Sequence, residues 1–127
     1  MPDSQHDLAE LARMSPRPDI RLIATDMDGT LVDDAKQIHD ELWPLVDELH
    51  ARGITFCPAS GRQYYNLLQE FEGVADELVF VAENGTYVVA QSREISSDCL
   101  ALGVAQQGVG RVRNIPEAGA VLCGKRS

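Results

Sequence analysis

The sequence predicts an α/β fold in which helices connect the strands of a parallel β-sheet. Three apolar runs, at residues 20–25, 54–59 and 78–82, alternate with segments whose apolar residues follow helical spacing. The order strand, helix, strand, helix, strand is typical of parallel sheets with right-handed crossovers. Such sheets bind ligands at the carboxyl ends of their strands. Two marked loops, at Asp26 and at Ser60, fall at these ends and are therefore the candidate functional segments.

The first strand and the first helix are predicted from apolar patterning. Residues 20–25 are almost unbrokenly apolar, which favours burial on both faces of a sheet covered by helices. In residues 40–51 the apolar positions recur at helical spacing, and Pro44 lies near the first turn, where proline is tolerated. Gly53 is placed to end this helix. Residues 20–53 thus form the first strand and crossover helix.

The next elements complete the parallel unit and then change its direction. Residues 54–59 are predicted as the second strand, residues 62–71 as the second helix and residues 78–82 as the third strand. Asn84-Gly85 then separates two apolar runs, which is a strong hairpin signal. A further strand at 86–90 is therefore expected to run antiparallel to the third.

The two ends of the chain are less regular. Residues 1–19 contain three prolines among polar residues and are predicted to be a flexible arm with at most one helical turn. After a turn at 91–93, residues 97–107 are predicted as a short helix and residues 120–123 as a strand. Gly103, Gly108, Gly110 and Gly119 break up the stretch before residue 120, and the tail is too short to close a core of its own.

Composition limits the possible functions. A chain of 127 residues has room for one domain. Its net charge of −9 argues against nucleic acid or an anionic membrane as a partner. No run approaches a membrane span, and no cationic, apolar leader is present, so the cytoplasm is the expected compartment. Three scattered cysteines match neither a disulfide framework nor a zinc site and are expected to be idle thiols.

The first loop carries two carboxylates directly after a predicted buried strand. Asp26 and Asp28 leave the strand on the same side because side chains alternate with a period of two, and Gly29 lets the backbone turn. Paired carboxylates need a cation or a shared proton, so this loop suits Mg²⁺ and a phosphoryl group. A calcium loop is excluded by Leu31 and Gln37 at its sixth and twelfth positions. A functionless acidic turn is the other alternative, which the preceding strand disfavours.

The second loop offers phosphate-binding groups. Ser60, Gly61 and Arg62 follow the second strand and open the second helix, where a hydroxyl and free backbone amides hold phosphate oxygens. Ser60 as a plain helix cap is the alternative. Arg62 either contacts substrate or pairs with a nearby acid, and the sequence leaves both open.

Together the two loops resemble the haloacid dehalogenase-like (HAD) superfamily of phosphohydrolases. Its first motif matches Asp26-Met27-Asp28-Gly29-Thr30-Leu31, and its second matches Ala59-Ser60-Gly61-Arg62. Arg62 and the Glu83-Asn84-Gly85 step are most similar to the Cof-type branch. The resemblance implies a partial Rossmann-like core at residues 20–85 and the beginning of an α/β cap at 86–127.

By position, the resemblance also implies roles for the site residues. Asp26 would be the nucleophile that becomes an aspartyl-phosphate, and Asp28 the general acid and base. Ser60 would bind phosphate, with Gly61 and Arg62 beside it, while Asp26 and the Asp28 carbonyl would bind Mg²⁺. The substrate would be a small phosphomonoester such as a sugar phosphate.

The resemblance is incomplete. Relatives in this superfamily carry a third-motif lysine and a fourth-motif pair of acids after the cap, and neither is present in this chain; Lys36 and Lys125 stand at other positions. The chain is therefore expected to be the N-terminal piece of a longer phosphatase, inactive or weak alone. Its first strand would be an open apolar edge that invites self-association. A non-catalytic assembly module and a phosphotransferase such as a mutase are the alternatives.

Overall fold

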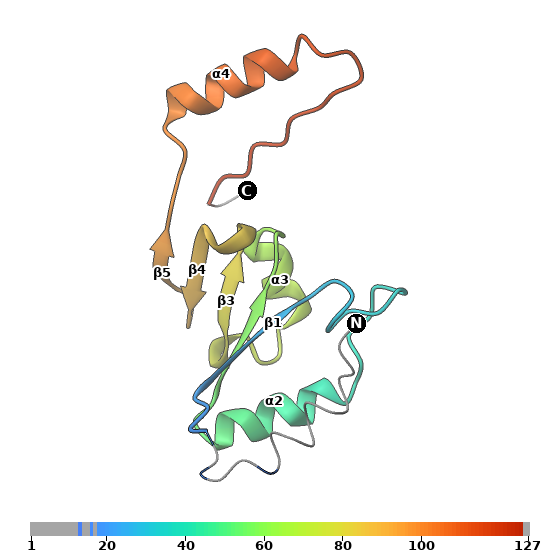
Figure 1. The fold of residues 1–127 in the computed structure, drawn as a ribbon, viewed down its shortest axis with the longest axis vertical. Helices are drawn as coiled ribbons and strands as arrows, with labels where there is room; N and C mark the ends of the chain where they lie inside the picture. Colours follow the sequence, from blue (N-terminus) through green and yellow to red (C-terminus); the bar gives the residue numbers. More distant parts are fainter. Residues whose placement is uncertain (1–12, 14–15, 17, 126–127) are drawn as a thin grey trace.

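A single five-stranded β-sheet forms the centre of the molecule. The computed structural model describes Arg13, Pro16 and residues 18–125. The strands lie in the order β1-β2-β3-β4-β5, so spatial order follows chain order (Figure 1). The predicted flexible arm at 1–19 falls almost wholly outside the described residues.

The sheet has a parallel part and an antiparallel part. Strands β1 (Leu22–Asp26), β2 (Thr55–Ala59) and β3 (Val79–Ala82) pair in parallel. Strands β4 (Tyr87–Ala90) and β5 (Arg93–Ser97) continue the sheet as antiparallel neighbours. This confirms the α/β class, the three parallel strands and the hairpin predicted at Asn84-Gly85.

Helices connect the parallel strands, as the sequence predicts. Helix α2 (Leu42–Ala51) joins β1 to β2, and α3 (Tyr64–Glu70) follows β2. The 3-10 turns η1 (Ala75–Glu77) and η2 (Glu83–Gly85) come directly before and after β3. Gly53, at a φ of +71°, lies just after α2, in the left-handed conformation that ends many helices.

The core lies between the sheet and these two helices. Phe71 at the end of α3 is fully buried and makes edge-to-face contacts with Trp43 and Phe80 at centroid distances of 5.7 and 6.0 Å. Such aromatic contacts add specificity to the apolar burial. The buried hydrophobic cluster comprises Met27, Val32, Val46, Phe56, Tyr64, Leu67, Phe71, Leu78, Phe80, Ala82 and Val89.

Strand β1 is less buried than its apolar sequence predicts. It lies at one edge of the sheet, and its residues alternate between exposed and half-buried. Leu22 is 56% exposed. The expectation of burial on both faces is therefore wrong within the described chain, because α2 packs mainly on β2 and α3 on β3 rather than over β1. The expectation of an open apolar edge at this strand is confirmed.

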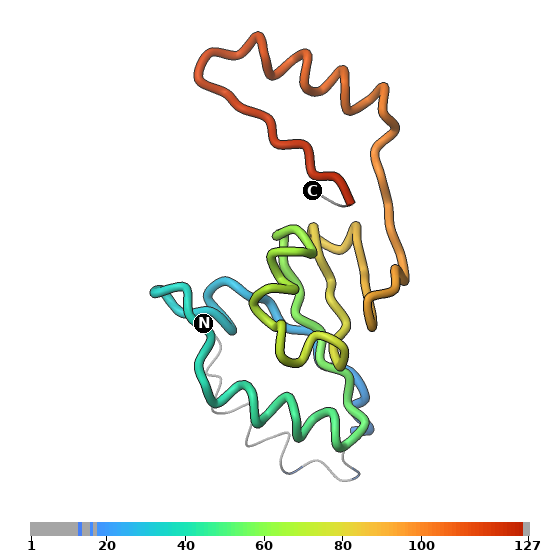
Figure 2. Tube along the Cα trace, turned by 180° about the vertical axis from the view of Figure 1, so that it is seen from behind, coloured from blue at the N-terminus to red at the C-terminus, as the bar shows by residue number. Residues whose placement is uncertain are grey.

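The C-terminal segment departs most from prediction. Strand β5 was not predicted, since Ile95 is its single apolar residue, and it forms through backbone pairing with β4. Helix α4 (Leu102–Val112) begins and ends about five residues later than predicted, because its glycines do not take the left-handed conformation that would end it. Residues 120–123 form no strand; they return toward the sheet as extended chain (Figures 1 and 2).

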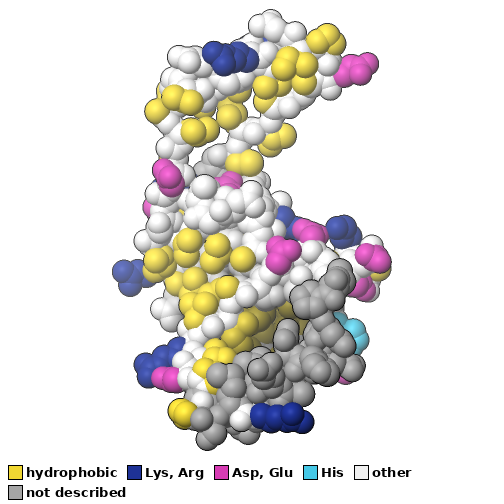
Figure 3. Space-filling view, viewed as in Figure 1, with side chains coloured by type: hydrophobic (Ala, Val, Ile, Leu, Met, Phe, Trp, Pro, Cys, Tyr) yellow, Lys and Arg dark blue, Asp and Glu magenta, His cyan; other side chains and the backbone are white. Residues whose placement is uncertain are grey.

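Helix α4 stands apart from the sheet (Figure 1). None of the residues of α4 is buried. Figure 3 shows hydrophobic side chains exposed over this part of the molecule. The most exposed of them are Leu100, Leu102, Val104, Ile115, Val121 and Leu122.

Candidate active site

The loop after β1 presents two carboxylates to solvent. Asp26 is the last residue of β1, and Asp26 and Asp28 are both exposed, whereas Met27 between them is fully buried. The Met27 carbonyl accepts hydrogen bonds from the amides of the three residues at 30–32, at 2.9 to 3.2 Å. Gly29 turns the chain at a φ of +76°. The loop thus exposes both carboxylates on either side of the buried Met27.

The loop after β2 lies beside the first one. In the sheet register Asp26 is paired with Ala59, so Ser60 directly follows the neighbour of Asp26. The Ser60 amide donates to the Val81 carbonyl at 2.9 Å, and its hydroxyl oxygen accepts the Arg62 amide at 3.2 Å. Since α3 begins only at Tyr64, Ser60 caps a turn before the helix rather than the helix itself.

Arg62 reaches back to the first loop. Its Nη2 donates to Asp28 Oδ1 at 2.7 Å, and its Nη1 pairs with Glu70. Lys36 Nζ donates to the same Asp28 oxygen at 3.0 Å. Of the two readings that the sequence left open for Arg62, the structure shows pairing with acids, one of which is the candidate general acid itself.

The two cations set the charge state of Asp28. The hydrogen bond from Arg62, and then that from Lys36, lower the pKa of the Asp28 carboxyl below its ordinary value of 3.8. Asp28 is therefore held as a carboxylate in this conformation. Lys36 had no predicted role in this site. The sequence feature that could have indicated this role is the turn Asp-Asp-Ala-Lys-Gln at residues 33–37. In this turn the Lys36 amide donates to the Asp33 carbonyl, and Lys36 has a φ of +61°, which turns the chain back toward the loop.

A third loop joins the first two. The Glu83 amide donates to the Arg62 carbonyl at 3.0 Å, and the Asn84 amide donates to the Ser60 carbonyl at 3.1 Å. From the sequence, this step was predicted as a hairpin turn and was matched to the Cof-type branch, without a contact to the other loops. The loops after β1, β2 and β3 consequently meet at the carboxyl ends of the parallel strands, the expected position of a ligand site in this class of sheet.

The first loop has oxygen atoms that suit a hard divalent cation. Among the described residues no side chain donates to the Asp26 carboxylate, and the loop amides donate to the Met27 and Val32 carbonyls rather than to that of Asp28. Carboxylate and carbonyl oxygens are the ligands that Mg²⁺ prefers. Within the described part of the chain, no three His, Cys, Asp or Glu residues form a metal cluster. The loop thus offers oxygen atoms of the kind that Mg²⁺ takes, without a cluster of three such side chains among the described residues.

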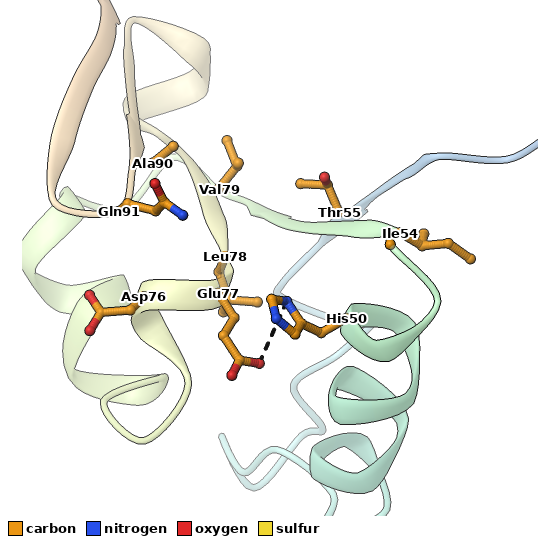
Figure 4. Close-up of a pocket in the computed structure, with 10 residues that line it drawn as sticks. His50, Ile54, Thr55, Asp76, Glu77, Leu78, Val79, Ala90 and Gln91 are labelled. Atoms are coloured by element: carbon orange, nitrogen blue, oxygen red, sulfur yellow. Dashed lines mark ion pairs between the residues drawn. The ribbon is translucent and has the colours of Figure 1, made fainter.

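A separate hollow lies at the opposite ends of the strands. It has a volume of about 270 Å³ and contains an ion pair between His50 of α2 and Glu77 of η1 at 3.8 Å (Figure 4). Thr55 and Val79, at the amino ends of β2 and β3, line it. None of the three loops contributes to it, so it is not part of the candidate site.

Two general observations bear on the class of protein. No helix in the described part of the chain has the length and apolar character needed to cross a membrane. Cys57 is buried, Cys99 and Cys123 are exposed, and all three are free thiols.

Residues 23–107 match the family model described as haloacid dehalogenase-like hydrolase. The chain is 38% identical over 109 residues to 5-amino-6-(5-phospho-D-ribitylamino)uracil phosphatase YbjI of Escherichia coli strain K12, an alignment that covers 85% of this chain and 40% of the relative. It is 36% identical over 75 residues to HMP-PP phosphatase of Cronobacter sakazakii, which covers 59% of this chain and 28% of that protein.

Solved structures agree with the sequence relatives. A haloacid dehalogenase-like hydrolase from B. subtilis superposes with a TM-score of 0.67 over 74% of this chain and 33% of its own, at 21% identity, and so shares the fold. The chain spans about 40% of the length of the E. coli relative. The family match covers more than half of the described chain and includes all three loops. The chain therefore belongs to the haloacid dehalogenase-like hydrolase family.

Proposed function

We propose that this chain carries the nucleophile and phosphate-binding half of a Mg²⁺-dependent phosphatase that hydrolyses small phosphomonoesters. The observation that supports this most directly is the register between β1 and β2, in which Asp26 pairs with Ala59, directly before Ser60. A nucleophile beside a phosphate-binding loop is the arrangement that attack on a held phosphoryl group requires. Family membership and two relatives with phosphatase names agree with the reaction class.

In the proposed reaction an Asp26 carboxylate oxygen attacks phosphorus while the bond to the substrate's ester oxygen breaks, which gives an aspartyl-phosphate. Asp28 donates a proton to the departing oxygen and later takes a proton from the attacking water. That second attack releases inorganic phosphate and restores Asp26. Mg²⁺ held by the Asp26 carboxylate and the Asp28 carbonyl would offset the negative charges that meet there.

The pairing of Asp28 has a consequence for this scheme. With Arg62 and Lys36 bound, the lowered pKa of Asp28 suits the base step and opposes the acid step. A substrate phosphate that attracts Arg62 would weaken its bond to Asp28 Oδ1 and raise the pKa of that carboxyl. We therefore propose that Arg62 exchanges between Asp28 and the phosphate group, assisted by Glu70 as its second partner.

We propose a small phosphorylated metabolite, such as a sugar phosphate, as the substrate. The names of the two curated relatives specify a phosphoribitylamino-uracil and HMP-PP, which are also small phosphorylated compounds. We further propose residues 20–85 as the catalytic core and 86–127 as the segment that leads into a cap, with β4 and β5 extending the core sheet. A phosphotransferase would use the same nucleophile, and transfer of labelled phosphate to a sugar acceptor rather than to water would identify it.

The test is Mg²⁺-dependent hydrolysis of p-nitrophenyl phosphate by the purified chain, with Asp26→Asn as the control and a thermal melt of both. Hydrolysis that needs Mg²⁺ and disappears in Asp26→Asn supports the assignment. Hydrolysis that survives Asp26→Asn in a folded variant contradicts it. If the folded chain alone is inactive, Asp26→Asn is made in a longer protein that begins with this chain and has the length of the relatives. We expect the substitution to abolish turnover there.

A second candidate function is assembly through the open edge of β1. The observation that favours it is that Ile20 and Leu22 are 51% and 56% exposed next to the unpaired backbone of an edge strand, a combination that invites pairing with another chain. Sedimentation velocity of the chain beside Leu22→Lys tests this. Association that the lysine abolishes supports an assembly role, and a folded monomer at all concentrations argues against it.

A further inference from the structure

The turn after β3 has an unusual backbone. Glu83 and Asn84 both have positive φ values, +51° and +57°, although neither is glycine. Consecutive residues in this region are uncommon, and such strain persists only where the surrounding contacts hold it. Asparagine tolerates this conformation better than most residues, yet glycine would adopt it without strain. The side chain of Asn84 is therefore expected to contribute something that glycine cannot.

That side chain lies over Gly61. A Cβ atom built on Gly61 would stand 3.0 Å from Asn84 Oδ1 and 3.2 Å from Nδ2. Gly61 does not have a positive φ, so the close approach of the carboxamide, and not a left-handed backbone, is what favours glycine there. No hydrogen bond joins the carboxamide to a described side chain, so its contact with Gly61 is one of packing.

The backbone of the same turn holds the second loop on both sides of Gly61. The Asn84 amide binds the Ser60 carbonyl, and the Glu83 amide binds the Arg62 carbonyl. With the carboxamide in the middle, the turn contacts three consecutive residues of that loop. These contacts fix the directions of the Ser60 hydroxyl and of the Gly61 amide, the groups that would face a bound phosphate.

We propose that Asn84 is a positioning residue, whose carboxamide packs on Gly61 and keeps the Ser60-Gly61-Arg62 segment in its phosphate-binding conformation. This inference rests on the proposed function, since it assigns Asn84 to the loop that would hold the phosphoryl group. It adds a third strand's loop to the site. The strain at Glu83 and Asn84 is then the consequence of placing a side chain where glycine would fit the backbone better.

The test compares two substitutions that relieve the same kind of strain. Asn84→Gly keeps the turn and removes the carboxamide. Gln91→Gly is the matched control, because Gln91 has a φ of +49° at the tip of the β4–β5 hairpin, outside the three loops. Both are compared with the unchanged chain by the NMR shift of the Gly61 amide and by its titration with inorganic phosphate in the presence of Mg²⁺.

We expect Asn84→Gly to move the Gly61 amide resonance and to weaken phosphate binding by roughly three- to tenfold, the size of a lost hydrogen bond or its equivalent in positioning. Gln91→Gly should change neither. The conservative Asn84→Asp, which keeps the size and backbone preference of the side chain, should restore the Gly61 resonance of the phosphate-free chain. If Asn84 served only the structure of its own turn, Asn84→Gly would change neither the Gly61 amide resonance nor phosphate binding, like Gln91→Gly.

A double substitution gives a readout that does not depend on phosphate. Gly61→Ala forces the Asn84 carboxamide aside by a few tenths of an ångström, so we expect it to shift the loop resonances. In the Asn84→Gly background the same alanine has no carboxamide to displace, and its effect should largely disappear. Equal effects of Gly61→Ala in both backgrounds would overturn the proposed contact.

The outcomes separate this inference from the function on which it rests. If Ser60→Ala and Asp26→Asn leave phosphate binding unchanged, the proposed function fails whatever Asn84 does. If Ser60→Ala weakens binding but Asn84→Gly does not, the proposed function stands and the role of Asn84 is overturned.

Discussion

The described residues up to Val89 and the C-terminal segment after them differ in how they bury apolar side chains. Between Met27 and Val89, strands β2, β3 and β4, helices α2 and α3 and the loops beside them contribute to one buried cluster. Between Val89 and residue 125, the last one described, no hydrophobic residue is buried, although α4 and the chain that follows it contain many. All residues of the candidate site belong to the first region. The contrast indicates that the site rests on a region that stabilises itself, whereas the second region depends on something else to cover it.

The largest expected effect tests the buried region. Phe71→Ala should lower the free energy of unfolding by about 3–5 kcal/mol, because Phe71 is fully buried against Trp43 and Phe80. Leu102→Ala in α4 should change it by less than about 0.5 kcal/mol, because Leu102 is 74% exposed. Urea denaturation followed by far-UV circular dichroism measures both. A large loss for Leu102→Ala would mean that α4 belongs to the same cooperative unit.

Hydrogen exchange should show the same difference without substitutions. We expect the amides of β2 and β3 to exchange at least about 100-fold more slowly than those of α4, since only the strands lie within a buried core. The measurement is native-state exchange read by NMR. Equal protection in α4 and β3 would remove the distinction between the two regions.

Two glycine substitutions should have opposite effects in the two regions. Gly53→Ala should destabilise the fold by about 1 kcal/mol, because Gly53 ends α2 at a φ of +71°. Gly108→Ala meets no atom within 4 Å and should raise the helix content of α4, through a gain in propensity of up to about 1 kcal/mol. Thermal melts and the helical dichroism signal measure these changes. A stabilised global transition in Gly108→Ala would show that α4 is coupled to the core.

The smallest effect concerns the link between the chain end and the sheet. Lys125 Nζ lies 2.9 and 3.0 Å from the Glu94 carboxylate oxygens and 5.9 Å from the Tyr87 ring centroid. Hydrogen bonds from Ser97 and then Lys125 hold the pKa of Glu94 below its ordinary value of 4.5. A carboxyl whose pKa is lowered in the folded state contributes its full stabilisation at pH values above its ordinary pKa. That stabilisation is lost as the pH falls through the lowered pKa.

Acidification below about pH 4 should therefore release the contact of Lys125. The Tyr87 ring resonances should then move toward those of a Glu94→Gln variant, whose own shifts should not depend on pH in this range. Because the pair is exposed, the melting temperature should change little. If the Tyr87 resonances change neither on acidification nor in the Glu94→Gln variant, the contact is absent in solution.

How far the sequence predicts this molecule depends on how each element is stabilised. The parallel strands and both helices follow from apolar patterning, and Asn84-Gly85 predicts the hairpin. Strand β5 was missed because pairing with β4, and not its own residues, makes it a strand. Burial of β1 on both faces was wrong because patterning reports which side chains are apolar, not whether a neighbour is present to cover them.

The candidate site shows the same limit. Asp26, Asp28 and Ser60 were predicted from their spacing after strands, since strand ends bring loops together. The pairing of Lys36 with Asp28 was missed because it depends on a left-handed residue in a local turn. The contact of Asn84 with Gly61 was missed because it joins loops 23 residues apart, and only the register of the sheet brings them together.

The central claim is that the three loops at the carboxyl ends of β1, β2 and β3 form one phosphate site with Mg²⁺. An NMR titration of the chain with inorganic phosphate, with and without Mg²⁺, tests it most directly. The account predicts Mg²⁺-dependent shifts in residues 26–30, 60–62 and 83–85, and none in α4. Shifts confined to the His50 hollow, or to the C-terminal segment, would contradict it.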